Sequence, residues 1–190
     1  MKGMIKKMMS EKRLVIIING KGGVGKDTLV NALNPWFVVR NVSSITPIKH
    51  IAKENGWDGE KDDKSRKFLA DLKQTFIDYN DLPTTYLINE YYNFLNSKLP
   101  PDQILVAHIR EGSEIEKFKS SINLPCVTIL IQRQIIDEKT FGNSHDNDVD
   151  NYNYDIIFDN NDSEEASKEK FVDLIMKIYA ERAVDPFKKD

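Results

Sequence analysis

The stretch Gly20-Lys21-Gly22-Gly23-Val24-Gly25-Lys26-Asp27-Thr28 decides the fold of this chain. It directly follows the apolar run Leu14-Val15-Ile16-Ile17-Ile18, which predicts a buried strand. The glycines predict a tight turn after that strand, and a helix is expected to begin near Gly25. This arrangement aims several backbone N–H groups and a helix N-terminus at one point, a geometry that suits a polyphosphate.

The spacing of the glycines and of Lys26 is that of a phosphate-binding P-loop. Lys26 adds a mobile positive charge for the outer phosphates of a nucleotide. A glycine-rich turn without a ligand is the alternative, but four glycines and two lysines in seven residues are poor material for a plain turn. The residues expected to hold the nucleotide are Gly20, Gly22, Gly23, Val24, Gly25, Lys26, Asp27 and Thr28.

Asp27 stands where the P-loop pattern has Ser or Thr. A short carboxylate at this position can contact Mg²⁺ directly or through water, so Asp27 is the metal-ligand candidate. Its alternative role is that of a negative charge favoured at a helix N-terminus. Thr28 either donates its hydroxyl to an α-phosphate or caps the turn.

The composition excludes several classes of function. With 190 residues, 40% of them hydrophobic, the chain can bury one sizeable core. A net charge of −3 and a pI of 5.7 give no global basic surface, so neither nucleic acid nor a membrane is expected as a partner. Cys126 is the only cysteine, which rules out an internal disulfide and favours a reducing, cytoplasmic setting.

Strand-like and helix-like segments alternate along the chain. Apolar runs predict four more strands, at 36–42, 104–109, 126–131 and 155–158. Helical spacing of apolar residues is found at 64–79, 84–98 and 163–183. The alternation predicts an α/β fold of the three-layer P-loop NTPase type, with a five-stranded parallel sheet and helices on both faces.

The expected organisation is one domain at 14–190, preceded by a flexible extension at 1–13 that lacks the features of a signal peptide. No run approaches the roughly 18 apolar residues of a membrane span. The largest insertion, at 45–100, falls on the carboxyl side of the sheet, where ligands bind in such folds. A short lid is expected at 134–152. The sequence does not indicate the oligomeric state.

Two families resemble the chain to different extents. Residues 21–26 resemble the deviant P-loop of the ParA/MinD-type ATPases, in which the first lysine reaches into a partner's active site. That resemblance implies a binding switch. It covers these residues alone, because Asp27 and the absence of an acidic residue after the second predicted strand depart from that pattern.

The rest of the chain resembles the deoxynucleoside monophosphate kinase and phosphomevalonate kinase branch of the nucleoside monophosphate kinases. Besides the Gly-Lys-Asp ending of the P-loop, five elements occur in the family's order from about residue 14 to the C-terminus. These are Ile45-Thr46-Pro47-Ile48-Lys49, Arg66-Lys67-Phe68-Leu69, His108-Ile109-Arg110 with Glu114, Arg133, and Asp155 with Asn160.

The resemblance implies an ATP- and Mg²⁺-dependent kinase. The expected acceptor of the γ-phosphate is a small phosphorylated molecule, namely a (deoxy)nucleoside monophosphate. Lys26, Arg110 and Arg133 are the implied catalytic cations, and Asn160 is implied in nucleotide binding. Lys49, Arg66 and Arg110 are implied to bind the acceptor phosphate.

Each cation also has a structural alternative. Arg110 lies at the carboxyl end of a predicted buried strand, where an unpaired guanidinium is costly and a phosphate would satisfy it. A salt bridge to Glu111 or Glu114 would satisfy it equally. Lys49 and Arg66 lie on amphipathic segments whose charged faces can simply be solvated.

Two departures from the kinase pattern support a further alternative, a nucleotide-binding regulator without turnover. His108 replaces an acidic residue, and the lid has no Arg or Lys except Lys139. His108 can be a base, a water-mediated metal partner or, the reading we favour, a satisfied core histidine. Tyr152 and Tyr154 either support a base or fix the last strand. Residues 146–150 imitate a calcium loop but lack its Gly and Glu, which indicates a solvated acidic segment.

Overall fold

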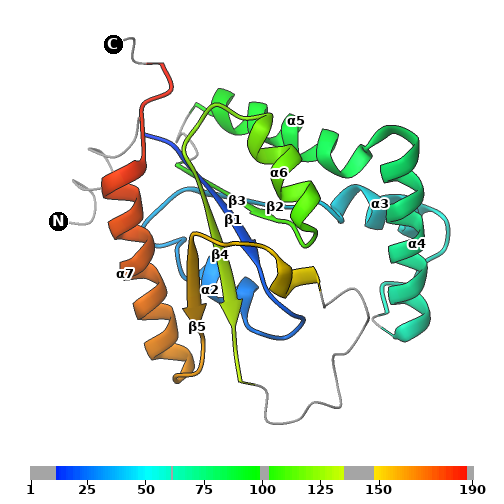
Figure 1. The fold of residues 1–190 in the computed structure, drawn as a ribbon, viewed down its shortest axis with the longest axis horizontal. Coiled ribbons are helices and arrows are strands. Elements are labelled where there is room, and N and C mark those ends of the chain that lie inside the picture. Colours follow the sequence, from blue (N-terminus) through cyan, green and yellow to red (C-terminus); the bar gives the residue numbers. More distant parts are fainter. Residues whose placement is uncertain (1–11, 61, 99–102, 135–147, 188–190) are drawn as a thin grey trace.

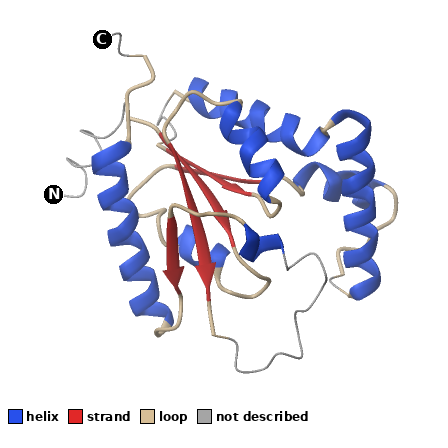
Figure 2. Ribbon diagram, viewed as in Figure 1, coloured by secondary structure: helices blue, strands red, loops and turns tan. Residues whose placement is uncertain are grey.

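Strand β1 (Leu14–Asn19) lies at the centre of a five-stranded parallel sheet (Figures 1 and 2). The computed structural model describes residues 12–60, 62–98, 103–134 and 148–187. The strand order is β2-β3-β1-β4-β5, and Ile16 of β1 pairs with Val106 on one side and Val127 on the other. The other strands are β2 (Val39–Ser43), β3 (Ile104–His108), β4 (Cys126–Gln132) and β5 (Ile156–Asp159).

Alternate residues of β1 enter two different hydrophobic cores, because successive side chains of a strand point to opposite faces. Leu14, Ile16 and Ile18 pack with residues of α2 (Lys26–Asn31) and α7 (Glu164–Arg182). Val15 and Ile17 pack with residues of α5 (Leu82–Asn96) and α6 (Gly112–Ser120). Helices therefore cover both faces of the sheet, which confirms the predicted three-layer α/β fold.

The segment between β2 and β3 forms a helical layer beside the sheet, with α3 (Thr46–Glu54), α4 (Asp63–Asn80) and α5 in succession (Figure 1). Asp62 caps α4, since its Oδ1 accepts a hydrogen bond from Ser65 N at 2.7 Å. Asp81 joins α4 to α5 in the left-handed conformation, with φ of 51°. We call residues 45–98 the acceptor-side layer, after the acceptor contacts that the kinase resemblance implies for Lys49 and Arg66.

One predicted strand has different bounds in the structure, and one helix was not predicted. The predicted second strand at 36–42 begins only at Val39, because Phe37 belongs to the turn after α2. Phe37 N donates to Leu33 O at 3.0 Å, and the Phe37 ring packs on Tyr179. Helix α6 was not predicted, since Ile115 and Phe118 are the only large apolar residues that it buries.

Several predicted segments lie wholly or partly outside the described residues. The N-terminal extension is described only from Lys12 onward, where Arg13 is buried and pairs with Val184 in an isolated antiparallel bridge. The lid at 134–152 and the acidic segment at 146–150 are described only in part, by Gln134 and by the short 3-10 helix η3 (Asp148–Asn151) with the residue that follows it. Among the helices that the structure describes, none has the length and apolarity to cross a membrane.

Candidate nucleotide-binding site

The loop after β1 has a backbone that only glycine adopts without strain. Gly20, Gly23 and Gly25 have φ angles of 143°, 80° and 91°. A Cβ on Gly20 would lie 2.4 Å from the carbonyl oxygen of Ile131, and one on Gly25 would lie 2.5 Å from Nδ2 of Asn160. The glycines therefore serve close packing of the loop against β4 and the β5–α7 connection as well as the turn itself.

Lys26, the first residue of α2, folds back over this loop. Its Nζ donates to the carbonyl oxygens of Gly20 at 2.5 Å and Lys21 at 2.8 Å. The side chain is half-buried and lies outside both hydrophobic cores. The ammonium group is thus held at the loop, where a phosphate can replace the two carbonyl groups as its partner.

Asn160, in the β5–α7 connection, also supports the loop. Its Nδ2 donates to Val24 O at 2.7 Å, and its backbone N–H donates to Gln132 O at 2.7 Å. The side chain is 7% exposed, so its amide is largely committed to holding the loop. The structure brings the predicted Asn160 to the P-loop, where it contacts loop backbone.

A cavity of about 90 Å³ lies next to this support. It is bordered by the P-loop, the first turn of α2, the residue after β4 and the start of α7. Ser167 of α7 is buried there, with a hydroxyl that has no hydrogen-bond partner among the described residues. The lining residues are Gly25, Thr28, Leu29, Arg133, Asn160, Asp162, Glu164 and Ser167. The predicted Arg133 and Thr28 therefore lie at one cavity with the loop.

His108 ends β3 on the face of the sheet that α2 covers, in the same row as Ile104 and Val106. Its Nε2 lies 2.9 Å from Oδ1 of Asn41 on the neighbouring strand β2. Burial lowers the pKa of His108 to about 4; the negative charge of Asp27 opposes this shift and the positive charge of Lys26 adds to it. His108 is therefore a neutral, hydrogen-bonded histidine at pH 7, and it lies near the two charged side chains that open α2.

Asn19, which sequence reasoning missed, joins three loops at the carboxyl edge of the sheet. Its Oδ1 accepts from Gly20 N at 2.8 Å, while its Nδ2 donates to the Arg110 carbonyl at 2.8 Å and to the Tyr154 hydroxyl at 2.6 Å. The Tyr154 hydroxyl in turn donates to Val149 O at 3.0 Å. The available signal was a polar residue ending an otherwise apolar strand.

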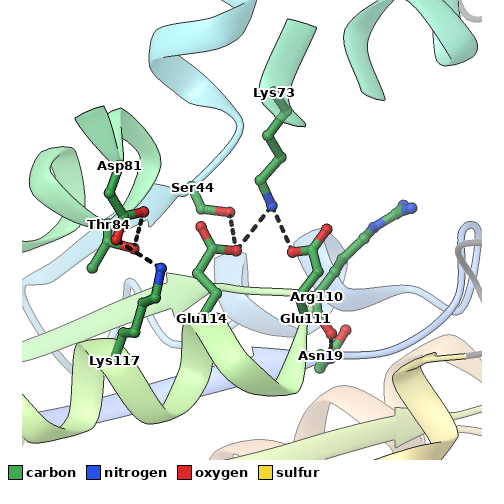
Figure 3. Close-up of polar contacts among 9 residues, drawn as sticks. All are labelled: Asn19, Ser44, Lys73, Asp81, Thr84, Arg110, Glu111, Glu114 and Lys117. Carbon is green, nitrogen blue, oxygen red and sulfur yellow. Dashed lines mark hydrogen bonds and ion pairs between the residues drawn. The ribbon is translucent and has the colours of Figure 1, made fainter. Parts of the chain in front are cut away.

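The guanidinium group of Arg110 is exposed, and in Figure 3 its side chain points away from the carboxylate of Glu111. Glu111 and Glu114, the partners suggested for Arg110, both pair with Lys73. Lys73 Nζ lies 2.5 Å from Glu111 Oε2 and 2.9 Å from Glu114 Oε2. Sequence reasoning missed Lys73, because nothing in a helical pattern distinguishes a buried lysine from a solvated one.

The other candidates are more dispersed. Lys49 lies half-buried on α3, and Arg66 lies on α4, where it pairs with Asp63 at 3.7 Å. Tyr152 bonds to Glu116 and to Lys119, and its ring packs on Tyr154. No group of three or more His, Cys, Asp or Glu residues within the described ranges is arranged to hold a metal ion.

Comparison with known proteins supports the fold. No protein-family model matches the sequence, and no curated protein is significantly similar to it. Similar solved structures include the dephospho-CoA kinase of Campylobacter jejuni, with 14% identity, a TM-score of 0.51, and coverage of 88% of this chain and 98% of that one. TT1252 of Thermus thermophilus has 14% identity, a TM-score of 0.50, and coverage of 87% and 97%.

A weaker likeness is to the shikimate kinase of Aquifex aeolicus, with 12% identity, a TM-score of 0.43, and coverage of 87% of this chain and 98% of that one. The fold of the chain is that of the P-loop small-molecule kinases. Membership in any family of these kinases stays a prediction.

Proposed function

We propose that the protein is an ATP- and Mg²⁺-dependent kinase that transfers the γ-phosphate of ATP to a small phosphorylated acceptor, a (deoxy)nucleoside monophosphate. One observation carries the proposal: the glycine loop, with its positive φ angles, holds the Lys26 ammonium group on its own carbonyl oxygens, which is a preformed site for a polyphosphate. The kinase-like fold around the loop supports it.

In this proposal the loop amides between Gly22 and Thr28 bind the β- and γ-phosphates, and Lys26 turns from the loop carbonyls to the phosphate oxygens. The cavity beside Arg133 receives the base, which can stack on the guanidinium plane of that arginine. Both sets of contacts position ATP, and positioning is most of what phosphoryl transfer requires of a protein.

Asp27 is the residue that fits Mg²⁺, because it is an exposed carboxylate at the start of α2, close enough to His108 to influence its pKa. Bound Mg²⁺ would neutralise charge on the transferring phosphoryl group. Arg110 would stabilise the charge of the acceptor or transferred phosphoryl group, since Asn19 fixes its backbone against the start of the P-loop. Lys49 and Arg66 are the proposed further contacts of the acceptor phosphate.

The decisive experiment follows transfer of ³²P from γ-labelled ATP to each member of a panel of nucleoside and deoxynucleoside monophosphates. Labelled product with at least one of them, lost in Lys26→Ala, is the expected result. ATP binding by calorimetry without any labelled product would overturn the proposal.

A second candidate is a nucleotide-binding regulator without turnover. It is favoured by His108, because this neutral side chain puts no negative charge at the end of β3. Binding of ATP with no transfer and no ATP hydrolysis would support this candidate.

A further inference from the structure

A cluster of charged side chains, formed by Lys73, Glu111 and Glu114, lies between the acceptor-side layer and α6 (Figure 3). Lys73 of α4 is 7% exposed and Glu114 of α6 is 4% exposed, and their side chains pair at 2.9 Å. Glu111, at the start of α6, pairs with the same lysine at 2.5 Å. The Ser44 hydroxyl, after β2, donates to Glu114 Oε2 at 3.2 Å.

The cluster connects segments that are far apart in the sequence. Ser44 precedes the acceptor-side layer, Lys73 lies in the middle of that layer, and Glu111 directly follows Arg110. Because the Arg110 carbonyl is also bonded to Asn19, a chain of contacts runs from α4 through α6 to the start of the P-loop. The cluster and the start of the P-loop are therefore joined through the segment that carries Arg110.

The cluster contains two carboxyl groups but only one ammonium group. In addition, Glu114 Oε1 is buried without a hydrogen-bond partner in the described structure. A cavity of about 150 Å³ borders Glu111 and Glu114, and the charged groups that line it from the other sides are Asp81 and Lys117. These two pair with each other at 2.9 Å, and Thr84 donates to Asp81 Oδ1. They give Glu114 Oε1 no donor.

A proton on the carboxyl pair would supply the missing positive charge, and a protonated Glu114 would bury no negative charge at its unpartnered Oε1. Burial raises the pKa of Glu114 to about 7; Lys73 opposes the shift and the neighbouring Glu111 carboxyl adds to it. Burial alone would raise the pKa of Glu111 as well, but its hydrogen bond with Glu114 and the charge of Lys73 lower it overall. Glu114 is thus the member of the pair that carries the proton.

We propose that Glu114 is a positioning residue: with one proton shared with Glu111, it holds α4 of the acceptor-side layer, through Lys73, against the segment that bears Arg110. When the proton leaves, one uncompensated buried negative charge remains and this contact loosens. The functional part of the inference rests on the proposed kinase activity, whereas the proton-linked contact does not.

Stability measurements test the proton. Because the pKa of Glu114 is raised in the folded state, its stabilising contribution is complete below pH 4.5 and is lost as the pH rises through about 7. Glu114→Gln keeps an oxygen for Lys73 and an N–H donor for Glu111, and so imitates the protonated form. We expect the Tm of the wild type to fall, relative to that of Glu114→Gln, between pH 5.5 and 8.5.

Glu116→Gln is the matched control, since it removes the same charge from an exposed position of the same helix. The pKa of Glu116 is lowered, first by its hydrogen bond with Tyr152, so its titration lies at more acidic pH. The Tm difference between this variant and the wild type should stay constant over the same range. Parallel curves of Tm against pH for the wild type and Glu114→Gln would overturn the proposal.

Hydrogen exchange locates the effect. At pH 8.5 amides of α4 and α6 should exchange faster in the wild type than in Glu114→Gln, and at pH 5.5 the two should agree, each compared at the same pH. If the protein transfers phosphate, the pH profile of kcat/KM for the acceptor should lose a limb near pH 7 in Glu114→Gln, with ATP affinity unchanged. Equal exchange at pH 8.5 refutes the contact, whereas a lack of transfer by the wild type refutes the proposed function alone.

Discussion

Two regions of the molecule are built from different interactions: the P-loop, which is the nucleotide side, and the acceptor-side layer with its contact to α6, which is the acceptor side. The P-loop is shaped by the backbone: three glycines with positive φ, Lys26 on two carbonyl groups, and Asn160 on a third. The acceptor side is joined to the sheet by side chains, with Lys73 between two carboxyl groups as the buried contact. A backbone site tolerates few changes at its glycines, whereas a side-chain contact can be altered one charge at a time.

This difference predicts that single substitutions separate binding from stability. On the nucleotide side, Lys26 is outside both hydrophobic cores, so its loss should remove function and leave the fold. On the acceptor side, Lys73 compensates buried charge, so its loss should weaken the fold first.

The largest expected effect is on ATP binding. Lys26→Ala should abolish measurable ATP affinity, because the loop loses the mobile cation that binds the outer phosphates. The free energy of unfolding should change by less than about 1 kcal/mol, as for most replacements outside a core. Calorimetric titration with ATP and urea unfolding check the two parts. Equal ATP affinity in wild type and variant would show that the loop is not a nucleotide site.

The next effect is on stability. Lys73→Met should reduce the free energy of unfolding by about 3–5 kcal/mol at pH 8, because it leaves the buried Glu114 carboxyl group and the half-buried Glu111 carboxyl group without their cation. Lys117→Met is the control, since its exposed ion pair with Asp81 should contribute less than about 1 kcal/mol. Urea unfolding of both variants measures the difference. Similar losses in the two variants would mean that the Lys73 cluster has no special role.

The same contrast explains what the sequence could predict. The strand–loop–helix pattern at 14–31, the parallel sheet and the layers on both faces follow from local signals: apolar runs, glycines and helical spacing. The bounds of the elements were predicted less well, as Phe37 shows. This aromatic residue of an apolar run lies in a turn, because its packing on Tyr179 outweighs its preference for a strand.

The acceptor side depends on contacts that local patterns do not encode. Lys73 and Glu114 are 41 residues apart, and each is an ordinary charged residue of its helix. Their burial follows from how α4 and α6 pack, which only the tertiary structure determines. The resemblance of His108-Ile109-Arg110 to a kinase element placed Arg110 near this region, but it did not indicate that Asn19 and Lys73 would fix the segment.

A smaller effect is expected at Arg110. If its guanidinium group contacts the transferring or acceptor phosphoryl group, Arg110→Gln should lower turnover by about 10²–10³, or roughly 3–4 kcal/mol, with ATP affinity within about threefold of the wild type. Arg182→Gln is the control, because it removes the same charge from an exposed position at the end of α7, far along that helix from the P-loop. Steady-state kinetics with the acceptor identified by the labelling assay measure the effect. Loss of ATP affinity in parallel with turnover would assign Arg110 to the nucleotide instead.

The smallest effect is expected at Lys21, and it separates a kinase from a ParA-like switch. The side chain of Lys21 is exposed, and the contact it offers to Lys26 comes from its backbone carbonyl, which an alanine retains. For a kinase, Lys21→Ala should therefore change ATP affinity and turnover by less than about tenfold, equivalent to about 1.4 kcal/mol. For a switch, the lysine would cross a dimer interface, so ATP should cause dimerisation that the variant loses. Light scattering with and without ATP measures the assembly state of both proteins. A dimer that forms with ATP and is absent in Lys21→Ala would contradict the kinase assignment, because the nucleotide side would then be completed by a second copy of the chain and not by the acceptor-side layer.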